Sequence, residues 1–143
     1  MELKVSQRGD GVSVFELSGR IVAGEELDGF RKQIRHAIAG GHKKILLNLG
    51  EVSYIDSTGL GEMVLALGTV TQTVCTSCGS TLFKDDQGHW DRCRQCNSTS
   101  RKAWGQFKLC CLDRQPTDLL HFTKLNTVFE VYPTEGKALQ SFE

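Results

Sequence analysis

Apolar residues in the first forty positions follow a strand pattern and then a helix pattern. Two β-rich stretches, Glu2 to Ser6 and Val12 to Ser18, are separated by the turn signal Arg8 to Gly11 and predict a hairpin. From Glu25 to Ala39 the apolar residues recur every three or four positions, and a glycine pair follows. This spacing predicts an amphipathic helix that packs by one face.

A continuous apolar run marks the next element. Ile45 to Leu47 lies within a predicted strand from Lys43 to Leu49, and three adjacent aliphatic residues are typical of a strand covered on both faces. Asp56 and the two hydroxyl residues after it can cap a helix, and apolar residues then recur at helical spacing as far as Val70. We therefore expect a sharp turn and a second helix that starts near Ser57.

The periodicity stops in the segment 73–105 and resumes after it. Polar residues and cysteines dominate this segment, which is too poor in aliphatic residues to build its own core. An insertion of this size is tolerable because the entropy of loop closure grows only logarithmically with length. After it, the pattern predicts a strand at Phe107 to Leu112, a helix from near Pro116, a strand around Thr127 to Tyr132 and a helix at Thr134 to Phe142.

These patterns predict one α/β domain that is interrupted by an insertion. Its two parts are residues 1–72 and 106–143, and the insertion is residues 73–105. A length of 143 residues agrees with a single domain and one small insert.

Charge and hydropathy exclude several classes of partner. Seventeen basic residues balance 17 acidic ones, so no net field attracts nucleic acid or an anionic membrane surface. No apolar stretch is long enough to cross a membrane, and the N-terminal segment lacks the apolar core of a signal peptide. We expect a cytoplasmic protein that binds neither nucleic acid nor membrane.

Cysteine spacing supplies the first candidate chemistry. Four of the six cysteines form two CxxC pairs that are separated by fourteen residues. Two such pairs on hairpin tips can place four thiolates around Zn²⁺, and a shell closed by four cysteines favours a structural over a catalytic metal. Redox dithiols and an iron-loaded electron carrier are the alternatives. The predicted ligands of this zinc ribbon are Cys75, Cys78, Cys93 and Cys96.

The residues around these cysteines agree with a metal site. Gly79 and Asn97, which follow the two pairs, are the residue types that best tolerate a positive φ. Cys110 and Cys111 lie in a predicted strand, so we expect their side chains on opposite faces, neither as a ligand. We expect His89 to be solvated or to pack beside Trp90.

The segment VSYIDSTGLG, Val52 to Gly61, carries a family resemblance. It is preceded by KKILLNL and followed, after the insertion, by GQFKLCCL and LLHFTKLNTVFEVY. Together these segments resemble the STAS domain of anti-sigma factor antagonists over residues 1–74 and 105–143. The resemblance implies a mixed β-sheet with helices packed mainly on one face.

The resemblance also implies a function. The serine after the aspartate, Ser57, would be the phosphoacceptor, and the surface that binds the partner would comprise Asp56, Ser57, Thr58, Gly59 and Leu60. Such a protein is not an enzyme. Unmodified, it binds an anti-sigma factor that is also a serine kinase and so frees a sigma factor; phosphorylation releases it, and a phosphatase resets it.

Two further points bear on this function. Many such antagonists carry Gly-Glu-Ile-Asp after the second strand, whereas this chain has Gly19-Arg20-Ile21-Val22. The alternative function is a scaffold subunit of a larger STAS-type signalling assembly, in which Ser57 is rarely modified.

Overall fold

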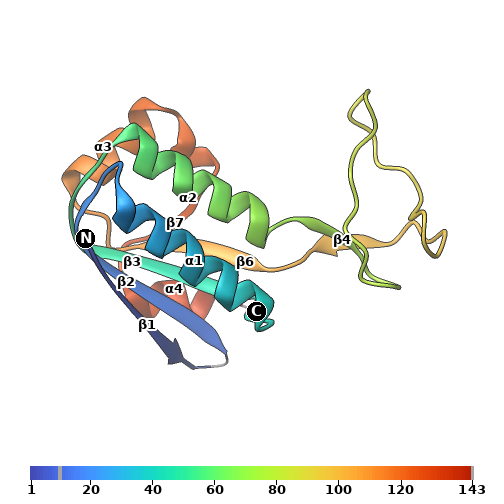
Figure 1. The fold of residues 1–143 in the computed structure, drawn as a ribbon, viewed down its shortest axis with the longest axis horizontal. Helices are drawn as coiled ribbons and strands as arrows, with labels where there is room; N and C mark the ends of the chain where they lie inside the picture. Colours follow the sequence, from blue (N-terminus) through green and yellow to red (C-terminus); the bar gives the residue numbers. More distant parts are fainter. Residues whose placement is uncertain (10, 143) are drawn as a thin grey trace.

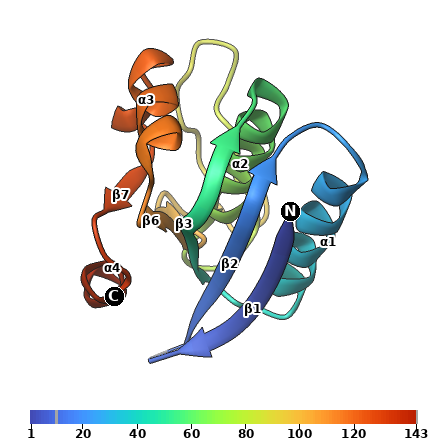
Figure 2. The same ribbon diagram turned by 90° about the vertical axis from the view of Figure 1, so that its left-hand side faces the viewer.

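A five-stranded mixed sheet forms the centre of the molecule. The computed structural model describes residues 1–9 and 11–142, so Asp10 of the predicted hairpin turn lies outside the described residues. The strands lie in the order β1-β2-β3-β6-β7; β1 and β2 are antiparallel, and the remaining pairs are parallel (Figures 1 and 2). Their bounds are Glu2–Arg8 for β1, Val12–Ile21 for β2, Lys44–Ile55 for β3, Gln106–Cys110 for β6 and Glu130–Tyr132 for β7.

The helices cover the two faces of the sheet unequally. A large core joins the sheet to the first three helices, and a small core joins it to the last, so that α1 and α2 lie on one side and α4 on the other (Figure 2). This arrangement confirms the expected mixed sheet with helices mainly on one face. None of the helices in the described residues is long and apolar enough to cross a membrane. The helices are α1 Glu25–Ala39, α2 Ser57–Val70, α3 Arg114–Phe122 and α4 Glu135–Ser141, with a short 3-10 turn at Leu125–Thr127.

Strand β3 is buried on both faces, as its apolar run predicts. Ile45 and Leu47 point into the large core, whereas Leu46 points into the small core beneath α4. All three side chains are fully buried. Side chains alternate between the faces of a strand, so a run without polar residues fits only a strand with protein on both sides.

The structure corrects several details of the sequence prediction, and the predicted strand around Thr127 is confined to Glu130–Tyr132. Strand β3 does not end at Leu49 but runs to Ile55, because its pairing with β2 continues through two register shifts. Cys110 and Cys111 do not lie on opposite faces, since both pack at the small core. Cys111 has a φ of 63°, which ends β6 at Cys110 and breaks the alternation.

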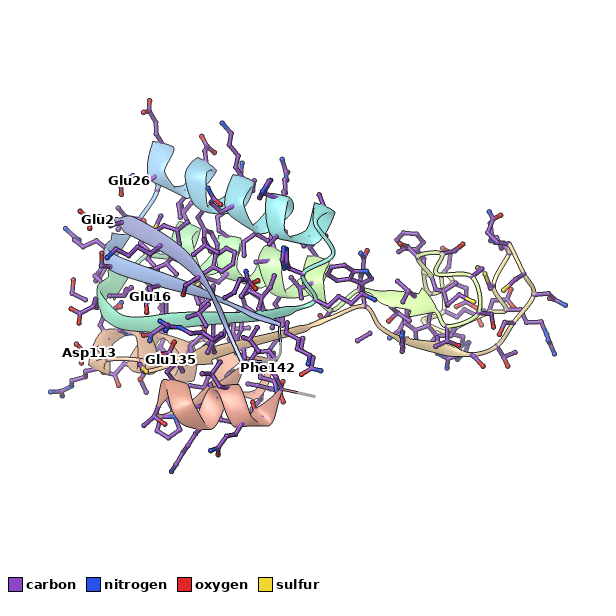
Figure 3. All side chains as sticks on the ribbon, turned by 90° about the horizontal axis from the view of Figure 1, so that it is seen from below. Glu2, Glu16, Glu26, Asp113, Glu135 and Phe142 are labelled. Atoms are coloured by element: carbon purple, nitrogen blue, oxygen red, sulfur yellow. The ribbon has the colours of Figure 1, made fainter. Side chains whose placement is uncertain are left out.

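A small two-stranded sheet emerges from the connection between α2 and β6. Strands β4, Thr73–Cys75, and β5, Arg101–Ala103, pair antiparallel and carry a long loop away from the host domain (Figures 1 and 3). We call residues 73–103 the arm. Neither core contains a described residue of the arm, and the Trp104 N–H donates to the Gln72 carbonyl over 2.7 Å at its root. The two ends of the insertion therefore meet where a tight turn could join them.

Replacing residues 73–103 with two glycines should leave the host domain folded. The change removes no core residue and closes a gap that is already bridged by a hydrogen bond. We expect cooperative urea unfolding with a free energy within about 2 kcal/mol of the full chain. Loss of the cooperative transition would show that the host needs the arm.

Candidate functional site

The four cysteines of the two CxxC pairs converge within the arm, where β4 ends at Cys75. The Sγ atoms of Cys75 and Cys96 lie 3.5 Å apart, as do those of Cys78 and Cys93, and all four sulfurs lie within 4.8 Å of one another. A tetrahedral site with bonds of about 2.3 Å would separate its sulfurs by about 3.8 Å. The cluster therefore has the size of a four-thiolate metal site.

The backbone of each CxxC turn holds its sulfurs in place. The Gly79 N–H donates to the Cys75 carbonyl over 2.9 Å, and the Asn97 N–H donates to the Cys93 carbonyl over 2.7 Å. Gly79 has a φ of 80° and Asn97 a φ of 63°, which confirms that both positions need a permissive residue. The two turns thus repeat one local geometry around a shared centre.

The thiols influence one another's ionisation. The Ser80 hydroxyl and N–H, with a smaller effect of Cys93, lower the pKa of Cys78 to about 6. The Ser98 N–H favours the thiolate of Cys96, but the contact with Cys75, burial, and the contacts with Cys78 and Cys93 outweigh it and raise that pKa to about 12. Four sulfurs this close cannot all carry a negative charge unless a cation lies between them.

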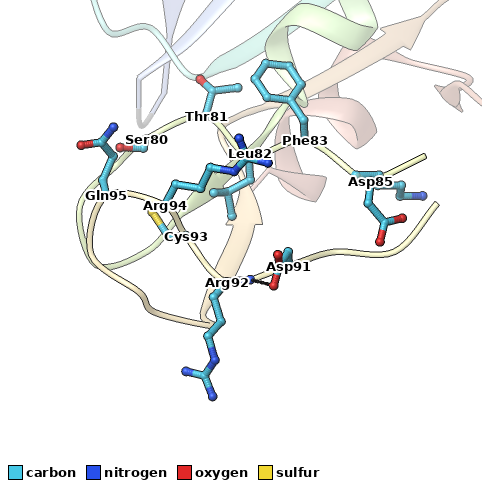
Figure 4. Close-up of a pocket in the computed structure, with 11 residues that line it drawn as sticks. Ser80, Thr81, Leu82, Phe83, Asp85, Asp91, Arg92, Cys93, Arg94 and Gln95 are labelled. Carbon is cyan, nitrogen blue, oxygen red and sulfur yellow. Dashed lines mark hydrogen bonds between the residues drawn. The ribbon is translucent and has the colours of Figure 1, made fainter. Parts of the chain in front are cut away.

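Apolar packing contributes little to the arm. Trp90 is half-buried, and the cationic groups of Lys84 and Arg101 lie 5.6 and 5.5 Å from its ring centroid. Phe83 is 81% exposed, and His89 is also exposed. The arm also contains a hollow of about 330 Å³, whose lining side chains are drawn in Figure 4. It is lined by residues 80–85 and 91–95.

A second candidate site lies at the opposite end of the host domain, where β3 turns into α2 (Figure 1). Asp56 caps α2: one carboxylate oxygen accepts the Gly59 N–H at 2.7 Å and the other accepts the Ala23 N–H at 3.0 Å. These hydrogen bonds, that of Gly59 first, lower the pKa of Asp56 below its usual range. The ionised carboxylate therefore holds the end of β2 against the start of α2.

The five residues of the predicted partner surface divide by burial. Ser57 and Thr58 are exposed at the start of the helix, and Asp56 is half-buried. Gly59 and Leu60 are buried, and a Cβ on Gly59 would lie 2.4 Å from the Ile21 carbonyl oxygen. The first pair is available to a partner, and the second pair sets the position of the turn.

Sequence reasoning did not find the residue that supports this turn from the other side. The Gln115 side chain donates to the Ile55 carbonyl over 3.0 Å and accepts the Ile55 N–H at 2.8 Å. The two residues are sixty positions apart, and no local pattern indicates such a contact. Gln115 thus fixes the last residue of β3, next to the cap.

Residues 4–72 match the STAS domain family. The host domain has a STAS-like fold. A search of curated protein sequences found no match. The family match ends where β4 begins and so leaves the arm outside it.

Solved structures resemble the chain over almost its whole length. A candidate anti-sigma factor antagonist from Thermotoga maritima is 20% identical, with a TM-score of 0.69 and coverage of 98% of this chain and 93% of that one. An anti-sigma factor antagonist from Mycobacterium paratuberculosis is 20% identical, with a TM-score of 0.67 and coverage of 99% and 92%. The phosphorylated form of the Bacillus cell fate determinant SpoIIAA is 17% identical, with a TM-score of 0.58 and coverage of 97% of each chain. At these identities the likeness shows the fold.

Gly59→Ala should destabilise the host domain, because the new Cβ would meet the Ile21 backbone at 2.4 Å and push α2 off the sheet. We expect a loss of about 2 kcal/mol or more in the free energy of urea unfolding. Gly61→Ala is the matched control. It lies in the same helix with open space around its Cβ and should be stabilising by about 0.5 to 1 kcal/mol. Equal effects of the two variants would contradict the close approach at Gly59.

Proposed function

We propose that this protein is an anti-sigma factor antagonist that acts as a partner switch controlled by phosphorylation of Ser57. In the unmodified state it binds an anti-sigma factor that is also a serine kinase and so releases a sigma factor. Phosphorylation of Ser57 ends the complex, and a phosphatase restores the binding form. The observation that carries the proposal is the exposed Ser57 hydroxyl at the start of α2, in a STAS fold similar to that of anti-sigma factor antagonists.

The local physical chemistry supports modification at Ser57. A phosphate adds about 1.5 to 2 negative charges, and the positive end of the helix dipole favours negative charge at the first residue of α2. Asp56 is already ionised beside it, so the modified turn would carry a dense negative charge. An anti-sigma factor that presents an acidic or apolar surface to this turn would then be repelled without any refolding of the domain.

Incubation with the cognate anti-sigma factor kinase and ATP should add one phosphate to the wild-type protein and none to Ser57→Ala. Intact mass spectrometry measures this directly. Thr58→Ala is the matched control, because Thr58 is the neighbouring exposed hydroxyl, and this variant should gain one phosphate as the wild type does.

Phosphate on Ser57→Ala, or none on the wild type, would overturn the switch. In the second case, elution as a large oligomer would support the scaffold function, since a scaffold subunit assembles without modification.

We further propose that the cysteine cluster holds one structural Zn²⁺. Four thiolates close the coordination shell and leave no position for a reacting water molecule. The arm has little apolar core, and zinc binding to such sites supplies about 10 to 16 kcal/mol. The metal would take the place of the core that the arm lacks, while Cys110 and Cys111 stay outside the site.

Native mass spectrometry should find one zinc ion per chain in the wild type and in Cys111→Ser, but not in Cys78→Ser. Removing the metal with a chelator should speed amide hydrogen exchange in the arm by at least about 100-fold, because the arm loses its main constraint. Exchange in α1 and β3 should not change. A coloured protein that contains iron would instead support the electron-carrier alternative. Equal protection of the arm from hydrogen exchange with and without metal would contradict a structural role.

A further inference from the structure

Arg20 lies at the same edge of the sheet as Ser57. It is one residue before the end of β2, and the register pairs it with Tyr54, which is one residue before the end of β3. The guanidinium carbon of Arg20 lies 4.9 Å from the centroid of the Tyr54 ring. Ser57 follows Tyr54 by three positions and begins α2. The sheet therefore places the Arg20 guanidinium beside the end of β3, the strand that precedes Ser57.

A backbone irregularity sets the position of Arg20. The register of β2 against β3 shifts between Gly19 and Arg20, so that Ser53 has no partner residue on β2. Gly19 has a φ of 89°, and the Ser53 hydroxyl donates to its carbonyl over 3.4 Å. Bulges of this kind bend a strand and change the direction of the next side chains. The direction in which Arg20 leaves the sheet is thus determined by the backbone.

The positive charge of Arg20 helps to lower the pKa of Asp56, but Arg20 forms no ion pair with that carboxylate. The N–H groups of Gly59 and Ala23 are the main causes of the lowered pKa of Asp56, and electrostatic attraction to Arg20 adds to them. Among the described residues, no carboxylate forms a salt bridge with Arg20. Its side chain is exposed and lies over the Tyr54 ring. A cation–π contact contributes only about 0.5 to 1 kcal/mol at an exposed site, so a nearby anion can draw the guanidinium away from the ring.

We propose that Arg20 is the internal partner of a phosphate group on Ser57. On phosphorylation the guanidinium leaves the Tyr54 ring and donates paired hydrogen bonds to phosphoryl oxygens, a geometry that arginine forms better than lysine. Tyr54, already 38% exposed, then loses its cover. The inference rests on the proposed modification of Ser57, and it extends the switch from one residue to a surface that includes Tyr54.

Full-length protein with phosphoserine incorporated at position 57 during translation tests the pairing directly. A ³¹P NMR titration reports the ionisation of the phosphate, which an adjacent cation favours. Arg20→Gln should raise the midpoint of this titration by about 0.5 pH unit, and Arg20→Lys by less. In the unmodified protein the Arg20 δ protons should be shifted upfield by the Tyr54 ring, and phosphoserine should abolish that shift.

Arg114→Gln is the matched control for charge. Arg114 begins α3 at the same edge of the sheet, but it is 93% exposed and lies 3.8 Å from Asp118. Its loss should move the midpoint by much less than the loss of Arg20. An unchanged midpoint in Arg20→Gln, an equal shift in Arg114→Gln, or an upfield shift that survives phosphorylation would overturn the pairing. No kinase or partner is needed, so these outcomes are separate from a failure of the proposed switch.

Discussion

The position of the candidate switch depends on the Asp56 carboxylate. Its two oxygens accept N–H groups from Ala23 after β2 and from Gly59 in the first turn of α2, and the residue itself directly follows β3. One ionised group thus joins three elements, of which β3 and α2 are consecutive and β2 is distant in sequence. Gln115 adds a fourth by binding both backbone groups of Ile55. A hydroxyl next to this junction is exposed yet held at a defined place, which suits a site that another protein must recognise.

Two different physical principles stabilise the two parts of the chain. The host domain buries aliphatic and aromatic side chains on both faces of its sheet. The arm buries little, and its paired cysteines lie where a cation would relieve their mutual repulsion. The stability of the host domain would then depend mainly on temperature and denaturant, whereas the stability of the arm would depend on metal concentration and pH. Helix α2 links the two candidate sites. It begins at Ser57 in the host domain, and its other end leads into the arm.

The sequence predicts those features that depend on local pattern. The bounds of α1, the start of α2 at Ser57 and the permissive residues after each CxxC pair all follow from periodicity, capping or the cost of positive φ. The features that it does not predict depend on partners distant in the chain. The extension of β3 to Ile55 requires β2 beside it, and the bonds of Gln115 require α3 beside β3. The position of Cys111 depends on a backbone angle that its residue type does not favour.

The hydrogen bond between Trp104 and Gln72 has a consequence for how such a chain arises in evolution. Because the two ends of the arm meet there, a single genetic event could add or delete the whole segment without changing any contact of the host core. Intermediates that carry a poorly folded arm would still contain an intact sheet, so selection could act on the arm alone. Homologous chains could then differ at this one point by an entire metal-binding unit and keep the same surface around Ser57.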